Sequence, residues 1–418
     1  MKASESVQNY APTARMYTNF TVRTIKKICA EIGPRECGKP EELKAQNYMA
    51  QTVGDAADEV KQDTFKVAPR AFLGWLRIAG ILMLAGVAVG VVNIFTAGVL
   101  YAPIVSLVFS ALICIMLFGE FLFYKEVTDP FFPKAESHNT YCIRKPTGEV
   151  KRRIILCGHS DSSIEWRPTH IGGKYFLYAS FAVPIIGLIY TVVTSIIMLK
   201  NGEINTVLLW VGCAFIPGYI NLSIFMNYKI CVDGANDNLT GCLMGASVIK
   251  FMGDNNIRFE NTEVVAMFSG GEEAGLRGAK AAAKQHPEFK DPNVETCVVA
   301  FDTIKDYDDM AIYNRDMTCT VKHDPRVAAL VKAAGKNCDL DLPYAVLFFG
   351  SSDAAATTQA GIPSVCFAAM NPGPPKYYHT RDDKADIMEP KTIEKGVQLA
   401  LETVFLFDEQ GLKENYDA

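Results

Sequence analysis

The 418-residue sequence lacks the patterns that mark proteins acting on nucleotides or nucleic acid. It has no glycine-rich phosphate loop with its lysine, and it has no sustained basic run. Its formal net charge is −5, so nucleic acid is not an expected partner. It also has no internal repeat and no Cys-x-x-Cys pair, which structural zinc sites often use.

Signals for export are missing as well. The first 30 residues contain no continuous apolar core, which a signal peptide requires. The 12 cysteines are scattered, and several of them, such as Cys157 and Cys297, fall within apolar runs. This distribution is typical of reduced core cysteines rather than of a disulfide framework, and it favours the cytoplasm.

Charged residues are absent from four long stretches, 78–97, 99–119, 175–199 and 204–228. Each has at least 20 residues, enough for a helix to cross a hydrocarbon core about 30 Å thick. Helices of a soluble core, or of an apolar dimer face, seldom run that far without a charge. We therefore expect four transmembrane helices in two hairpins, which turn at residues 96–98 and 200–203.

Two adjacent carboxylates, Glu272 and Glu273, end the run VVAMFSGGEE. The apolar part predicts a buried strand, and Gly270-Gly271 predicts a tight turn after it. Two carboxylates repel each other there, and a bound cation would compensate their charge while leaving one of them free to transfer protons. Adjacent glutamates are also common at the solvated start of a helix. Whether this pair belongs to a cation site therefore depends on whether the sequence supplies further ligands.

Four other places supply such ligands. They lie at or near the ends of apolar runs and contain His159 and Asp161; Asp233, Asp237 and Asn238; Asp302; and His379. Taken singly, each is explained by capping or turn chemistry. Taken together, most of them fall where a strand ends, and ligands of an open α/β sheet collect at the carboxyl ends of its strands. Histidines and carboxylates without clustered thiolates suit zinc or manganese.

In their order and spacing, the segments GHSDS, GANDNLTG, GGEEAGLRGAK, FDT and YYHT resemble the M28 family of dizinc aminopeptidases. The N-terminal stretch around Gly33-Pro34-Arg35 and the later segment GSSDAAATTQAGIPSVCF resemble the same family. The resemblance covers 1–70, 126–174 and 229–418, which we expect to form one discontinuous peptidase domain. Residues 71–125 and 175–228 would be the two inserted transmembrane hairpins.

The resemblance implies a metal centre with two divalent ions, for which zinc is the expected metal. Asp237 would bridge the two ions through its two carboxylate oxygens. His159 and Asp302 would complete the protein ligands of one ion. Glu273 and His379 would complete those of the other.

The resemblance also implies catalytic and supporting roles. Glu272 would take a proton from the metal-held water and return it to the leaving amine. Asp161 would hydrogen-bond the far nitrogen of His159, as a metal-bound imidazole requires. Tyr378 is a candidate for hydrogen-bonding the oxyanion, and a strained peptide bond is expected at Asn238. The family often has a histidine at the position of Ala354, a departure that leaves the ligand set intact.

The expected fold is a three-layer α/β sandwich with a mixed, largely parallel sheet, joined to four transmembrane helices. LMGASVIKFM and PKTIEKGVQLALETVFLFDEQ have helical patterns, and the second should pack on the sheet. Basic residues flank the spans at one end, whereas Lys200 alone lies at the other; they are Arg70, Arg77, Lys125, Arg167, Lys174 and Lys229. The positive-inside rule then places the catalytic domain in the cytoplasm of a protein integral to the plasma membrane.

The expected function is a membrane-anchored aminopeptidase whose partners are short peptides and the lipid bilayer. Other reactions on the same scaffold stay open: a carboxypeptidase, an amidohydrolase or a glutaminyl-cyclase-like acyltransferase. A non-catalytic membrane scaffold is an alternative from a different class, although such relatives usually lose ligands. The residue preference, the native metal and the oligomeric state are left open by the sequence.

Overall fold

The computed structural model describes residues 2–96 and 99–416. The chain divides into two compact units. One comprises Met1–Pro69, Lys134–Ser163 and Cys231–Ala418, and we call it the sheet unit; Arg70–Pro133 and Ile164–Ile230 form the other, the helical unit. In the predicted turn of the first hairpin, Ala97 and Gly98 lie outside the described residues.

The sheet unit is built on one sheet with the strand order β1-β2-β6-β3-β7-β11-β8-β10, and β9 pairs with β8. Its central strands β6, β3, β7 and β11 are mutually parallel, and antiparallel pairs flank them on both sides. The strands are β1 (Glu59–Val67), β2 (Ala135–Arg144), β3 (Arg152–His159), β6 (Thr262–Ser269), β7 (Glu295–Ile304), β8 (Met310–Asp316), β9 (Val321–Lys322), β10 (Tyr344–Val346) and β11 (Ser364–Ala369).

Both faces of the sheet are buried, which explains why its central strands are continuous apolar runs. Along β3, Ile154 and Leu156 point into one core, whereas Ile155 and Cys157 point into the other. Helices on the first face are α1 (Tyr10–Glu31), α2 (Pro40–Val53), α8 (Thr240–Asp254), α10 (Pro325–Asn337) and α12 (Pro390–Gln410). Those on the second face are α9 (Arg277–Gln285) and α11 (Asp353–Gln359).

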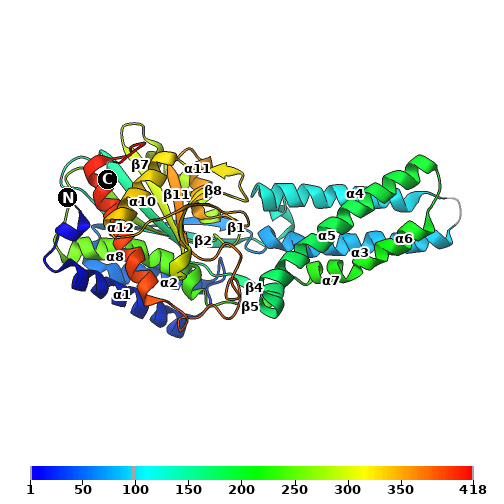
Figure 1. Ribbon diagram of the computed structural model, residues 1–418, viewed down its shortest axis with the longest axis horizontal. Helices are drawn as coiled ribbons and strands as arrows, with labels where there is room; N and C mark the ends of the chain where they lie inside the picture. Colours follow the sequence, from blue (N-terminus) through cyan, green and yellow to red (C-terminus); the bar gives the residue numbers. More distant parts are fainter. Residues whose placement is uncertain (1, 97–98, 417–418) are drawn as a thin grey trace. The chain divides into compact units, whose positions relative to one another are not determined.

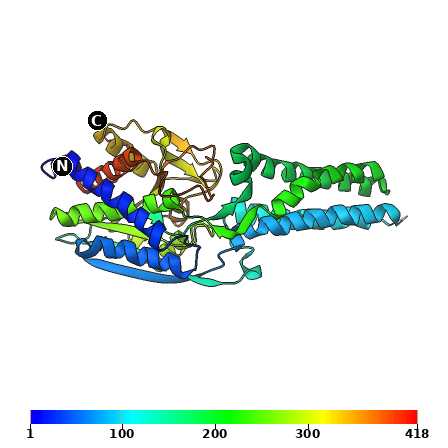
Figure 2. The ribbon, with the colours of Figure 1, turned by 90° about the horizontal axis from the view of Figure 1, so that it is seen from below.

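Figure 1 shows the sheet between these two layers of helices, and Figure 2 shows α1 and α2 beside α8. The predicted three-layer sandwich with a mixed, largely parallel central sheet is confirmed. The two helices predicted from LMGASVIKFM and PKTIEKGVQLALETVFLFDEQ are confirmed as α8 and α12.

The parallel arrangement decides where the candidate ligands meet. β3 ends at His159, β6 ends three residues before Glu272, and β7 contains Asp302 near its end at Ile304. β3 pairs with β6 on one side and with β7 on the other. The carboxyl ends of these three strands therefore lie side by side at one edge of the sheet.

Among the residues that the structure describes, the helical unit has four helices that are long and apolar enough to cross a membrane, as expected from the uncharged runs. They are Ala71–Phe95 (α3), Tyr101–Leu122, Arg167–Asn201 (α5) and Thr206–Ser223. The second consists of α4 (Tyr101–Met116) and one π-helical turn, and the fourth consists of α6 (Thr206–Gly212), a short 3-10 turn and α7 (Ile216–Ser223). A two-stranded ribbon, β4 (Ile164–Trp166) with β5 (Met226–Cys231), joins the ends of the second hairpin.

The chain enters and leaves the helical unit at one end of the bundle. At the first hairpin, the ring of Phe72 stacks on that of Phe121, with centroids 6.2 Å apart. At the second, the Arg167 backbone N–H donates to the carbonyl of Phe225 at 3.0 Å. Phe181 stacks on Phe121 and packs against Phe225, so the same aromatic cluster joins both hairpins.

Candidate metal centre

Asp237 lies between two histidines at the carboxyl edge of the sheet. Its Oδ1 is 3.1 Å from Nε2 of His159, and its Oδ2 is 3.2 Å from Nε2 of His379. The same nitrogen of His379 is 3.2 Å from Oε1 of Glu273. Asp237, His159 and His379 are all buried. Residues separated by up to 220 positions in the sequence therefore gather around one carboxylate, each of whose oxygens faces a different imidazole.

Unusual backbone conformations present three of these side chains. Asp237 stands in the irregular turn Ala235–Leu239, and the peptide bond between Asp237 and Asn238 is cis. Glu273 comes two residues after Gly271. Gly271 has φ +61° and so supplies the left-handed residue of the predicted tight turn. His379 itself has φ 53°, a conformation that turns the chain after the Pro/Gly loop.

Asp161 connects the His159 segment to the Glu-Glu segment, in a different way from the prediction. Its Oδ1 accepts a hydrogen bond from the backbone N–H of Glu272, and its Oδ2 accepts one from that of Glu273, both at 3.1 Å. Nδ1 of His159 lies 3.2 Å from the carbonyl oxygen of Asp161 and 3.5 Å from its Oδ1. The carbonyl is thus the nearer partner of the imidazole, and the carboxylate fixes the turn that carries both glutamates.

Glu272 lies beside His159, with its Oε2 3.8 Å from Nε2. Burial raises the pKa of Glu272 well above its usual range, and the nearby carboxylates of Glu273, Asp353 and Asp302 raise it further. His159 acts in the opposite direction. Glu272 therefore combines a perturbed pKa with a position beside His159, a combination typical of residues at functional sites.

Asp302 stands at the end of β7, where Oδ1 accepts a hydrogen bond from Oγ1 of Thr303 at 3.0 Å. Burial raises its pKa to about 7, against the effect of His159. Asn238 connects this strand end to the Asp237 turn, because its Nδ2 donates to the carbonyl of Phe301 at 2.8 Å. Its Oδ1 accepts from the backbone N–H groups of Gly241 and Thr303.

Tyr378 stacks on His379, with ring centroids 3.9 Å apart and an interplanar angle of 19°. Burial, together with the carboxylates of Asp237 and Glu273, raises the pKa of Tyr378 well above its usual range. The phenol therefore stays protonated at neutral pH and keeps its ability to donate a hydrogen bond. Its position beside His379 also restricts how the imidazole ring turns.

The charges of the site suit a cation. Burial acts to lower the pKa of His379, but Glu273 and Asp237 outweigh burial and raise it to about 10. Burial similarly opposes the carboxylates around His159, which raise its pKa well above the usual range. Each imidazole thus points a nitrogen at an oxygen of Asp237, and a bound cation would compensate the surrounding carboxylates. Donor atoms of His159, Asp237 and Glu273 lie within 4.8 Å of one another, and imidazole with carboxylate is a donor set that zinc accepts.

Comparison with protein families found a match to peptidase family M28 over residues 222–404. The matched range contains Asp237, Glu272, Glu273, Asp302 and His379, so this part of the chain resembles that family. Comparison with curated proteins found no match.

Solved structures similar to this chain include the aminopeptidase from Aneurinibacillus sp. strain AM-1, with a TM-score of 0.55 and 15% identity over 95% of each chain. A zinc aminopeptidase from Bacillus subtilis has a TM-score of 0.54 at 14% identity, over 96% of each chain. A glutaminyl cyclase from Fimbriiglobus ruber has a TM-score of 0.53 at 15% identity, over 93% of this chain and 95% of its own. At these identities the likeness establishes a shared zinc-exopeptidase fold.

A second buried group of possible ligands was not predicted from the sequence. Cys37 and Glu42 lie close to Asp161, near enough to hold an ion by spacing alone. The carboxylate of Glu42, however, accepts hydrogen bonds from the backbone N–H groups of Gly38 and Gly271 and from Ser137. Burial, and secondarily Asp161, raise the pKa of Glu42 to about 8. We infer that Glu42 stabilises the turn before Glu272. No local sequence motif predicts this contact, because the two segments are far apart in the sequence.

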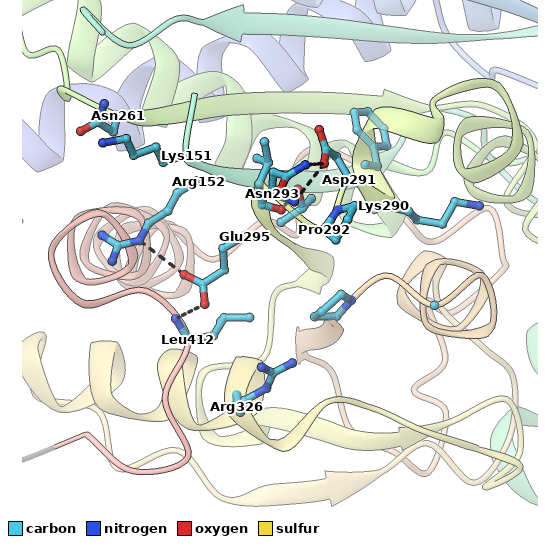
Figure 3. Close-up of a pocket in the computed structure, with 15 residues that line it drawn as sticks. Lys151, Arg152, Asn261, Lys290, Asp291, Pro292, Asn293, Glu295, Arg326 and Leu412 are labelled. Carbon is cyan, nitrogen blue, oxygen red and sulfur yellow. Dashed lines mark hydrogen bonds and ion pairs between the residues drawn. The ribbon is translucent and has the colours of Figure 1, made fainter. Parts of the chain in front are cut away.

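An open depression of about 820 Å³ lies at the opposite edge of the sheet (Figure 3). Its wall includes Arg152 and Glu295, the first residues of β3 and β7, which pair with each other at 3.4 Å. None of the candidate ligands lines it. The metal centre and this depression are therefore at opposite ends of the same parallel strands.

Proposed function

We propose that this protein is a membrane-anchored dizinc aminopeptidase of the M28 type, which removes N-terminal residues from short peptides. One observation carries the proposal: each oxygen of Asp237 faces the Nε2 atom of a different histidine. A carboxylate that bridges two metal ions has this arrangement, whereas a carboxylate that serves one ion needs only one imidazole beside it.

The residues present divide into two ligand sets. His159, Asp302 and Asp237 would hold one ion, and His379, Glu273 and Asp237 would hold the second. Zinc held by these residues would supply a Lewis acid for the scissile carbonyl and would lower the pKa of a bound water to about 7.

Glu272 is the residue that moves protons. It accepts one from the attacking water and donates it to the leaving amine, a contribution of about 10²- to 10⁴-fold to the rate. Asp161 holds Glu272 and Glu273 in place through their backbone N–H groups, at 3.1 Å each. The phenol of Tyr378, which stays protonated, donates a hydrogen bond to the oxyanion that forms on the substrate.

The helical unit anchors the enzyme in the plasma membrane with its sheet unit in the cytoplasm. Support comes from the four apolar helices and from the common end at which the chain enters and leaves the bundle. The basic residues that flank the spans gather at this end, and basic residues are retained in the cytoplasm. Partners of the enzyme are therefore cytoplasmic peptides and the bilayer.

A pair of neighbouring substitutions tests the proposal in detergent-purified full-length protein. Glu272→Gln should reduce the hydrolysis of aminoacyl-amide substrates by about 10²-fold or more while two zinc ions remain bound. Glu273→Gln, a change of the same chemistry one residue on, should lower the zinc content. Equal zinc loss in both variants would contradict this division of labour.

Zinc content and substrate assays of the wild-type protein distinguish the aminopeptidase reaction from the alternative reactions. Two zinc ions with hydrolysis of free-amine substrates support the aminopeptidase. Two zinc ions with conversion only of N-terminal glutaminyl, blocked or C-terminal substrates would replace it by a cyclase, an amidohydrolase or a carboxypeptidase. Folded protein that binds no zinc or manganese would favour a non-catalytic scaffold.

A further inference from the structure

Arg35 is a fully buried cation that the mechanism does not use. Its side chain is 0% exposed, and its guanidinium donates to main-chain carbonyls rather than to a carboxylate. Nε donates to the carbonyl of Ser160 at 2.7 Å, Nη1 to that of Asp233 at 2.6 Å, and Nη2 to that of Gly234 at 2.9 Å. Arg35 therefore joins the residue after His159 to the start of the turn that carries Asp237.

Asp383 is a buried anion on the other side of the same turn. Its Oδ2 accepts a hydrogen bond from the backbone N–H of Asp237 at 3.0 Å. Its Oδ1 accepts from the backbone N–H and from the side-chain amide of Asn236, at 3.0 and 2.7 Å. Asp383 stands four residues after His379, so it joins the His379 loop to the residue that lies between the two histidines.

The segment 233–237 is thus held by opposite charges. A cation binds carbonyl oxygens at its beginning, and an anion binds N–H groups at its end. Burying either charge is unfavourable unless it is hydrogen-bonded, and backbone groups supply most of those hydrogen bonds here. Because both charges are satisfied largely by backbone groups, they fix distances between the three chain segments that carry His159, Asp237 and His379.

We propose that Arg35 and Asp383 act as a clamp that sets the spacing of His159, Asp237 and His379 for two metal ions. Both are positioning residues: neither contacts substrate, and each acts through the backbone of a ligand-bearing segment. The inference rests on the proposed function for the identity of the ligands, but it concerns metal binding and so is measured without peptide hydrolysis.

The test measures zinc affinity by chelator competition and the visible spectrum of the cobalt-loaded protein, in full-length wild type and Asp383→Asn. Asparagine preserves the shape of the side chain but turns an NH₂ group toward one of the N–H donors. A supporting residue of this kind should lower zinc affinity by about 10- to 100-fold when altered. The cobalt bands should also shift, because the geometry around the ions changes.

The control is Glu402→Gln, because Glu402 is another buried carboxylate of the sheet unit that accepts two backbone N–H groups, from Ala3 and Ser4. It should lose thermal stability while keeping wild-type zinc affinity and cobalt bands. Arg35→Lys, which keeps the charge but not the fork of donors, provides a second variant if Asp383→Asn does not fold.

Zinc affinity within about twofold of wild type and unchanged cobalt bands, in a folded clamp variant, would overturn the clamp. So would an equal loss in Glu402→Gln, because the effect would then belong to stability alone. Wild-type protein that binds two metals but hydrolyses no peptide would instead refute the proposed function and leave the clamp standing.

Discussion

Gly241 occupies a position where a single methyl group should disturb the proposed metal centre without touching a proposed ligand. It is the second residue of α8, and a Cβ added there would lie 2.0 Å from the carbonyl oxygen of Phe301 and 2.3 Å from Oδ1 of Asn238. Those two residues are the neighbours of Asp302 and Asp237. Alanine at this position therefore pushes apart the two chain segments that share one ion in the proposed site.

The size of the effect follows from the contacts. Over-packing of this kind costs about 1–3 kcal/mol, partly offset by the 0.5–1 kcal/mol or so that alanine gains over glycine within a helix. If the ligand segments carry the whole strain in the metal-loaded protein, about 1–3 kcal/mol corresponds to a loss of zinc affinity of about 5- to 150-fold.

Gly253→Ala is the matched control, because it lies in the same helix and its added Cβ would meet Ala56 at 2.3 Å, away from the site. Both variants should unfold at lower temperature than wild type when metal-free. Chelator competition should show a loss of zinc affinity only in Gly241→Ala. Wild-type zinc affinity in Gly241→Ala, or an equal loss in both variants, would refute the reasoning.

Two further predictions concern stability. Phe405→Ala removes a ring that is 2% exposed and packs edge-on against Phe259 and Phe251, so it should cost about 3–5 kcal/mol in denaturant unfolding while the zinc affinity of the folded fraction stays unchanged. Asn93→Ala removes the amide that donates to the Val99 carbonyl at 2.8 Å and accepts from the Ala102 N–H at 3.0 Å, so it should destabilise the first hairpin by about 1–3 kcal/mol. Thermal unfolding in detergent measures the second effect, and a loss no greater than that in Ser110→Ala, which removes only a hydroxyl bonded within its own helix, would contradict it.

The sequence predicts the elements of the sheet unit because their patterns are local. Apolar runs end at His159 and just before Glu272, and the structure ends β3 at His159 and β6 at Ser269. The apolar periodicity of residues 390–410 is found as α12 with the same bounds. Where the sheet is parallel, ordered strand ends are sufficient to bring distant ligands to one edge.

Contacts between segments that are distant in the sequence could not be predicted from local sequence patterns. Asp161 follows His159 by two residues, so a hydrogen bond to the imidazole was the natural expectation, yet its carboxylate binds backbone N–H groups more than 100 residues away. Backbone donors carry no sequence signature, because every non-proline residue has one. For the same reason, the contacts of Arg35 and Asp383 with the segment 233–237 could not be predicted from the sequence. The family resemblance of the stretch Gly33-Pro34-Arg35 singled out Arg35, but it did not predict which groups the side chain contacts.

The measurement that tests the central claim most directly is an anomalous difference map at the zinc edge, from crystals of the zinc-loaded full-length protein. Two separate peaks on either side of the Asp237 carboxylate are expected, one beside His159 and the other beside His379 and Glu273. A single peak, or peaks that leave Asp237 without a metal contact, would contradict a bridged dizinc centre.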